Sequence, residues 1–169
     1  MKPVFKYPLI ASALVIALKL VVVYAHMQLT PFGIFLGIFS FILMAVPIFL
    51  ALKNRRDNEL GGFLTVKQAM GTGMFFSIIT GIIVGIFIYV FSSYIDHETT
   101  PLILKKIEEN LRAANASPAE IETELTAQKD FYSPFNQALK GGLISVLVFG
   151  FILSFICSMF VMKNPPAQN

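Results

Sequence analysis

The sequence predicts an all-α membrane protein in which four hydrophobic helices cross the bilayer and a helical hairpin lies outside it, between helices three and four. Of the 169 residues, 56% are hydrophobic and only 14% are charged, whereas soluble domains carry about 25% charged residues. The charges also gather in short clusters between long charge-poor tracts, a layout typical of membrane proteins. We expect one transmembrane domain over residues 1–169, with an extracytoplasmic insertion at 96–140.

Four tracts are long enough to span a membrane. A helix needs about 20 apolar residues to cross a hydrocarbon core of about 30 Å. In hydrocarbon only a helix or a closed barrel pairs all of its backbone groups. Barrel strands alternate apolar and polar residues, and these tracts do not, so they are expected to be helices. The tracts cover residues 8–27, 32–52, 68–95 and 141–162.

The first tract also has features of a signal peptide, because Lys2 and Lys6 precede an apolar run. Against cleavage, Lys19 interrupts the run and no small-x-small cleavage site follows it. We therefore expect a retained first helix.

Local signals define the other boundaries. Pro31 separates the first two helices, because proline lacks a backbone donor, and Pro47 predicts a kink inside the second. The sequence from Thr65 to Gln68 fits a capping box, which predicts that the third helix starts at Thr65. Extended to Ile95, this helix would be about 46 Å long, so it must tilt or project from the membrane.

The segment 96–140 is the one sizeable part expected outside the membrane. Apolar residues recur in it at helical spacing, and Ser117-Pro118-Ala119-Glu120 is a typical helix start. This pattern predicts two short amphipathic helices that form a hairpin. The alternative is a partly disordered loop, because the apolar content is modest.

Basic residues predict the orientation. Lys2, Lys6, Lys163 and the basic residues of the 53–67 loop flank one set of helix ends, and the loop between the first two tracts has no lysine or arginine. The positive-inside rule therefore places both termini and the 53–67 loop in the cytoplasm. The expected location is a bacterial cytoplasmic (inner) membrane, with 96–140 on the outer side.

The stretch from Gly61 to Gly73, GGFLTVKQAMGTG, together with Ile88-Tyr89 and Tyr94-Ile95-Asp96 at the end of the same helix, resembles the domain of unknown function 4199 family. The four-helix layout and the long segment before the last helix are also similar to that family. The resemblance covers nearly the whole chain. It implies a small four-helix bacterial membrane protein, mostly of Bacteroidetes, and it implies no activity and no functional residues.

Small residues recur every four positions on three of the predicted helices. Such residues let helix backbones approach closely in lipid. One interpretation is packing within a single bundle, and the other is a homodimer seam on the third helix. The residues are Gly73, Ser77, Gly81 and Gly85 on the third helix, Gly33 and Gly37 on the second, and Gly150, Ser154 and Ser158 on the fourth.

Lys19 is the one ionisable residue well inside a predicted span, where a charge costs roughly 2.5–3.5 kcal/mol. In a functional interpretation it lines an internal cavity and binds an anionic group, such as a solute or a lipid phosphate. In a structural interpretation it points into the bundle or extends to the outer surface, where hydroxyls, carbonyls or carboxylates meet it.

A second polar group is expected at the outer surface, where Asp96, His97 and Glu98 cluster at the outer end of the third helix and His26 lies at the outer end of the first. If these ends meet, the group could hold a divalent metal or sense pH. The spacing matches no known metal motif, so the alternative is a solvated helix end, and we expect no metal or cofactor.

The motifs of the common enzyme classes are missing from the sequence: it has no phosphate-binding loop, no His-Glu-x-x-His and no nucleophile elbow. We therefore expect no catalytic activity. We also expect no nucleic-acid partner, because the basic residues form no continuous face. The first hypothesis is a structural, accessory or partner-binding component that binds another membrane protein or itself. The alternative is a small-solute or ion transporter with Lys19 in the pathway. A lipid-modifying enzyme would have only the Asp96–Glu98 group to use.

Overall fold

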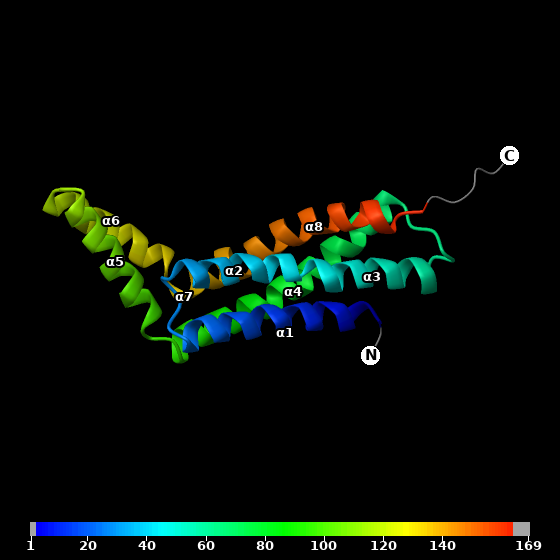
Figure 1. Ribbon diagram of the computed structural model, residues 1–169, viewed down its shortest axis with the longest axis horizontal. Coiled ribbons are helices and arrows are strands. Elements are labelled where there is room, and N and C mark those ends of the chain that lie inside the picture. Colours follow the sequence, from blue (N-terminus) through cyan, green and yellow to red (C-terminus); the bar gives the residue numbers. More distant parts are fainter. Residues whose placement is uncertain (1–2, 164–169) are drawn as a thin grey trace.

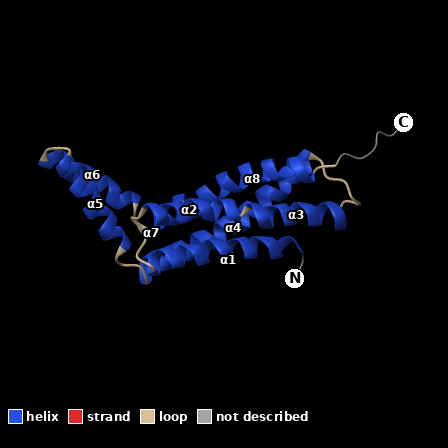
Figure 2. Ribbon diagram, viewed as in Figure 1, coloured by secondary structure: helices blue, strands red, loops and turns tan. Residues whose placement is uncertain are grey.

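The computed structural model describes residues 3–163 and is built from helices (Figures 1 and 2). Residues 3–163 contain no β-strand, and one isolated antiparallel bridge pairs Leu64 with Lys163. In chain order the helices are α1 (Pro3–Tyr24), α2 (Pro31–Leu43), α3 (Ala45–Asn58), α4 (Val66–Tyr94), α5 (Thr99–Ala113), α6 (Pro118–Phe131), α7 (Pro134–Asn136), the π-helix η1 (Gln137–Ile144) and α8 (Ser145–Val161).

Four helices in this range are long and apolar enough to cross a membrane, which confirms the predicted number. They are α1, the combined α2 and α3, α4, and the continuous rod of α7, η1 and α8. The longest, α4, has 29 residues and is therefore about 44 Å long. These four helices indicate a multi-pass membrane protein.

The outer surface of the bundle supports the same conclusion. Large apolar side chains point away from the core on every spanning helix, and Ile86 on α4 and Phe160 on α8 are 62% and 77% exposed. A soluble protein rarely exposes so much contiguous apolar surface. On a membrane protein this surface faces the lipid chains.

Four helix ends differ from the prediction. α1 starts at Pro3 rather than at residue 8. The second span runs to Asn58 rather than to residue 52, so Lys53, Arg55 and Arg56 belong to α3 and not to a loop. α1 ends at Tyr24 rather than Met27, because His26 adopts a left-handed conformation with φ 52° that ends the helix. The last span begins at Pro134 rather than Gly141. Its N-cap is Ser133, whose side chain accepts a hydrogen bond from the backbone N–H of Asn136. This Ser-Pro start repeats the pattern of Ser117-Pro118, and it moves Lys140 from the predicted insertion into the last helix.

Pro47 accounts for the interruption of the second span at Met44. A proline has no N–H to donate to the carbonyl four residues earlier, here Leu43, and its ring collides with that carbonyl. The α-helix accordingly stops at Leu43 and resumes at Ala45, as the predicted kink requires.

Both predicted helix starts have a capping box. At the start of α4, the Thr65 side chain accepts from the backbone of Gln68, and the Gln68 side chain accepts from the backbone N–H of Thr65. At the start of α6, Ser117 and Glu120 make the same reciprocal pair. Each box satisfies backbone donors that a helix start would otherwise leave unpaired.

α5 and α6 lie side by side and project beyond the end of the four-span bundle (Figure 1). A short turn joins them, in which Asn115 has a positive φ of 58°. Neither helix has a fully buried residue, so the pair adds little to the core of the bundle.

α4 forms the centre of the bundle and packs along α8 and η1. The small residues of its predicted face, Gly73, Ser77, Gly81 and Gly85, are all buried. A Cβ placed on Gly73 would collide with the side chain of Ser154, and a Cβ on Gly150 would collide with that of Ser77. The face is therefore covered by the same chain, and a dimer formed through it would have to displace α8.

Gly33 and Gly37 on α2 do not make the helix contact expected of them. A Cβ on Gly33 would collide with the backbone carbonyl of Met27, in the turn that precedes α2. A Cβ on Gly37 would meet no atom within 4 Å. Gly33 thus allows a tight turn, and Gly37 borders an open space.

The π-helix η1 packs against α4 in backbone contact. A Cβ on Gly142 would lie 2.6 Å from the Cα of Gly85, so Gly142 has no room for a side chain. Ser145 donates a hydrogen bond to the carbonyl of Lys140, five residues earlier, over 2.7 Å.

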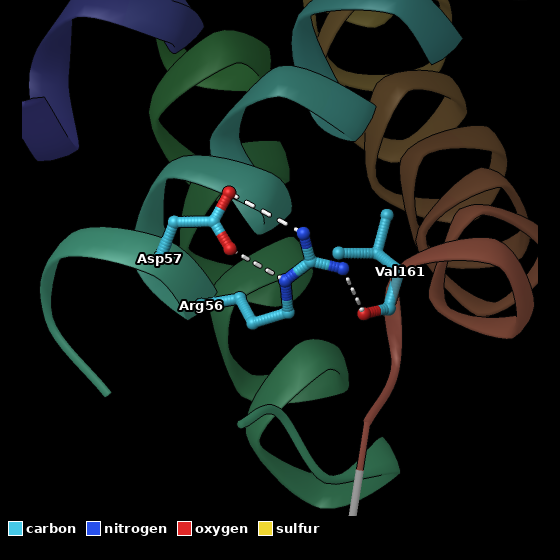
Figure 3. Close-up of polar contacts among 3 residues, drawn as sticks. All are labelled: Arg56, Asp57 and Val161. Carbon is cyan, nitrogen blue, oxygen red and sulfur yellow. Dashed lines mark hydrogen bonds and ion pairs between the residues drawn. The ribbon is translucent and has the colours of Figure 1, made fainter. Parts of the chain in front are cut away.

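The end of the bundle farthest from α5 and α6 carries five basic residues, Lys53, Arg55, Arg56, Lys67 and Lys163. We call it the basic end. Lys2 lies outside the described residues. Arg56 donates from Nη1 to the carbonyl of Val161 over 3.0 Å and from Nε to Asp57 over 2.7 Å (Figure 3). Arg56 therefore supplies a cation to the C-terminus of α8, where carbonyls are unpaired.

Candidate functional site

A cavity of about 470 Å³ lies inside the half of the bundle nearest α5 and α6. Its walls come from α1, α2, α4 and η1, and residues at the bases of α5 and α6 also line it. This volume falls in the range of small-molecule sites, which is about 300–1,000 Å³. The cavity is therefore large enough for an organic ligand.

Lys19 lines this cavity. None of the ion pairs in the described part of the chain includes it. The Asp96 carboxylate, at the start of α5, accepts a hydrogen bond from the backbone N–H of Thr99 over 3.0 Å. The ammonium thus faces a mostly apolar space without a directly bonded anion.

Lys140 is a second lysine on the cavity wall, contributed by η1. Its Nζ lies over the ring of Phe131, 4.5 Å from the ring centroid, which is a cation–π distance. Lys19 lies within about two helical turns of the end of α1, and Lys140 within about two turns of the start of the last span. The two lysines therefore occupy the same end of the cavity.

Hydrogen bonds tie the base of α5 to the neighbouring helices above this cavity. Gln28, in the turn after α1, donates to Thr99 over 3.3 Å. Gln137 donates to Thr100 over 3.3 Å and to the carbonyl of Tyr132 over 2.7 Å. Ser92 on α4 donates to Gln137 over 3.4 Å. These amides and hydroxyls make this end of the cavity polar.

The opposite end of the cavity is apolar. Val15 on α1, Phe41 on α2, and Val84, Phe87 and Ile88 on α4 line it. The cavity therefore has two chemically different ends, one cationic and hydrogen-bonding, the other hydrocarbon.

The residues of the predicted outer cluster, His26, Asp96, His97 and Glu98, lie at the ends of helices near the surface. His26, His97 and Glu98 are exposed, and Asp96 serves as the hydrogen-bond acceptor at the start of α5. Within residues 3–163, no group of three or more histidine, cysteine or acidic side chains could hold a metal ion. The geometry describes solvated helix ends.

A groove of about 770 Å³ runs between α5 and α6. Half-buried Leu104, Ile121 and Leu125 form its apolar part. Its remaining lining residues include charges of both signs, namely Lys105, Glu108, Arg112, Glu122 and Lys129.

Sequence reasoning found Lys19 but missed Lys140, Gln28, Asn136 and Gln137, which also line the cavity. These residues lie outside the charge-free tracts, so they were assigned to loops. The Ser133-Pro134 helix start was the signal that could have placed Asn136, Gln137 and Lys140 on a membrane helix.

The helices and the apolar surface define a class, a multi-pass helical membrane protein with an internal cavity. The chain belongs to the DUF4199 family of proteins of unknown function, whose model matches residues 6–163. This match covers nearly the whole chain and confirms the resemblance seen in the sequence. No curated protein and no solved structure matches the chain.

Proposed function

We propose that this protein is a non-catalytic accessory component of the bacterial cytoplasmic membrane that binds another envelope protein through the groove between α5 and α6. The groove carries the proposal. It combines an apolar strip with a rim of both charges, and it lies on a helix pair without fully buried residues of its own.

The proposed orientation places both termini and the basic end in the cytoplasm, and α5 and α6 form a hairpin on the outer side. The positive-inside rule supports it, because seven of the 13 lysines and arginines lie at residues 2, 6, 53, 55, 56, 67 and 163. The turn between α1 and α2 holds none.

The chemistry of the groove suggests an amphipathic helix as the bound segment. Such helices place apolar residues at i, i+3, i+4 and i+7 into an apolar groove while charged residues on either side pair with the rim. Leu104, Ile121 and Leu125 would receive the apolar residues. Lys105 and Glu122 on the rim would select for charge pattern and orientation.

Site-specific photo-crosslinking in living cells tests this proposal. A photoreactive benzoylphenylalanine replaces Lys105 or Thr126, which line the groove, or Glu109 or Ala127, which are exposed elsewhere on the same two helices. The expected result is an adduct of one defined mass from the groove positions only, identified by mass spectrometry as a membrane or envelope protein.

The controls are matched, because each groove position has a control on its own helix. Equal crosslinking from all four positions would contradict a groove-specific partner. An adduct of twice the chain mass would instead indicate a homo-oligomer, which contradicts a foreign partner but keeps the groove as the interface.

The cavity favours one alternative function, a small-solute or ion transporter with Lys19 in the pathway. This alternative predicts that an anionic solute crosses proteoliposome membranes that contain the protein. Lys19→Met should abolish this flux and leave the helix content unchanged, as measured by circular dichroism. Flux that survives the substitution would contradict a pathway through Lys19.

A further inference from the structure

The two lysines of the cavity create a local excess of positive charge. Lys19 and Lys140 both line it. Within residues 3–163, neither lysine forms an ion pair. Lys19 is half-buried, and a cation in an apolar environment is costly unless an anion or a set of hydrogen bonds compensates it. Lys140 is exposed and adds a second positive charge at the same end of the cavity, which is therefore suited to a bound anion.

The polar groups near the lysines leave the two ammonium groups as the donors for an anion. The amide groups of Gln28, Asn136 and Gln137 lie on the same wall, but their N–H groups already donate within the chain, to Thr99, to the Asp130 carbonyl and to the Tyr132 carbonyl. The Ser145 hydroxyl likewise donates to the Lys140 carbonyl. These bonds hold the polar wall in place, and the ammonium groups of the lysines can make charge-assisted hydrogen bonds to a carboxylate or phosphate oxygen.

The remainder of the cavity requires a different chemistry. Val84, Phe87 and Ile88 on α4 line it together with Phe41 on α2. Apolar cavities of this kind stay dry and accept hydrocarbon, whereas a small hydrated anion would leave this part unfilled. One ligand that satisfies both ends carries an anionic head and a hydrocarbon tail.

We propose that the cavity binds a single-chain anionic amphiphile, with its carboxylate or phosphate head between Lys19 and Lys140 and its tail against Val84, Phe87 and Phe41. This inference goes beyond the proposed partner-binding function and does not depend on it. A cavity of about 470 Å³ fits a molecule of drug-like size, so one chain rather than a whole two-chain lipid is the expected ligand.

Binding to the full-length protein, purified in a neutral maltoside detergent, tests the proposal. The probes are laurate and dodecyl phosphate, which share a tail and differ in the head. Butyrate has the same head as laurate without a long tail, and dodecanol has the tail without the charge. Native mass spectrometry counts adducts, and the melting temperature measured by circular dichroism reports stabilisation.

The expected result is saturable binding of laurate, dodecyl phosphate or both, and none of butyrate or dodecanol at the same concentrations. Preference for laurate would identify a free fatty acid as the ligand chemistry, and preference for dodecyl phosphate would identify a lipid phosphate. Lys19→Met should weaken binding about tenfold or more, because charge-assisted hydrogen bonds are the strong ones. The double variant Lys19→Met/Lys140→Met should lose it.

Lys67→Met is the matched control, because Lys67 is exposed at the basic end, on the other side of the bundle. It should bind as the unmodified protein does. Equal affinity of Lys19→Met and the unmodified protein, or binding of butyrate as tight as that of laurate, would overturn the proposal.

Gly37→Leu gives a second test that leaves both lysines in place. Gly37 lines the cavity, and a Cβ there would meet no atom within 4 Å, so a leucine has room to enter the tail region without disturbing a helix contact. Laurate should bind this variant more weakly. If Lys19→Met fails to fold, undiminished binding by Gly37→Leu would refute the assigned tail position and with it the proposal.

Discussion

Gly142 and Gly85 bring the last span and α4 into backbone contact, because a Cβ on Gly142 would lie only 2.6 Å from the Cα of Gly85. This contact holds η1 against α4. The same π-helix carries Gln137 and Lys140 into the cavity wall. The packing of two glycines thus fixes the position of the polar end of the cavity.

Gly142→Ala should therefore destabilise the protein. Overpacking of a close contact costs about 1–3 kcal/mol, and the colliding atom is backbone, which cannot rotate away. Gly141→Ala is the control, because a Cβ there meets nothing within 4 Å and alanine is the better helix former. Thermal unfolding in detergent should show a lower melting temperature for the first variant only. Equal melting temperatures would contradict the importance of this contact.

Much of the fold could be predicted because the relevant signals are local. Charge-free length predicts a span, and the Thr65–Gln68 and Ser117–Glu120 pairs predict helix starts from hydrogen bonds that lie within four residues. Pro47 predicts a break for an equally local reason, the missing donor and the ring collision. Each of these features appears in the structure.

The cavity could not be predicted in the same way, because its walls come from residues far apart in the chain. The sequence indicates that Lys19 is unusual, but not that Lys140 lies on the same cavity. The position of Lys140 depends on a helix start at Pro134 and on the wide turn of η1. The spacing of the glycines likewise could not show which of them makes a helix contact. A Cβ on Gly73 would collide with Ser154, whereas a Cβ on Gly37 would meet no atom within 4 Å.

Arg56 connects α3 with the end of α8, and Arg56→Gln should weaken this connection. The substitution removes the cation and the hydrogen bond to the Val161 carbonyl, so an unpaired carbonyl remains at a helix C-terminus. We expect the melting temperature to fall by a few degrees.

The control is Lys53→Gln, which removes the same charge from the same helix. It should change stability less, because Lys53 is exposed and forms no ion pair in the described residues. Equal falls in melting temperature for the two variants would mean that the net charge matters, and not the hydrogen bond from Arg56 to the C-terminus of α8.

Glu120 predicts a pH dependence of α6. Hydrogen bonds from the backbone N–H and the hydroxyl of Ser117 hold the pKa of the Glu120 carboxyl below its ordinary value of 4.5. The folded state therefore binds this proton less readily than the unfolded state. The stabilisation is fully present above pH 4.5 and is lost as the pH falls through the lowered pKa.

Amide hydrogen exchange in α6, followed from pH 6 to pH 3 after correction for the intrinsic pH dependence of exchange, checks this prediction. The protection of the first turn should decrease at the acid end, and Glu120→Gln should remove most of that change, because glutamine does not titrate. Glu122→Gln is the control, since no hydrogen bond to its carboxylate is found among the described residues. Protection that decreases equally in all three proteins would mean that another group titrates.

The orientation of the bundle gives the last prediction, and Cys157 makes it simple to test. This cysteine, the only one in the sequence, is 6% exposed, and its thiol contacts the carbonyl of Ala45, so it should react slowly with a charged maleimide. Ala127→Cys adds an exposed thiol on α6, and Asn58→Cys adds one at the end of α3.

The positive-inside rule places Asn58 in the cytoplasm and Ala127 outside. In cells whose outer membrane has been permeabilised, a membrane-impermeant maleimide should label the Ala127→Cys variant at once. The Asn58→Cys variant should react only after the inner membrane is broken. The reverse order would invert the proposed topology, and the groove between α5 and α6 would then have to bind a cytoplasmic partner.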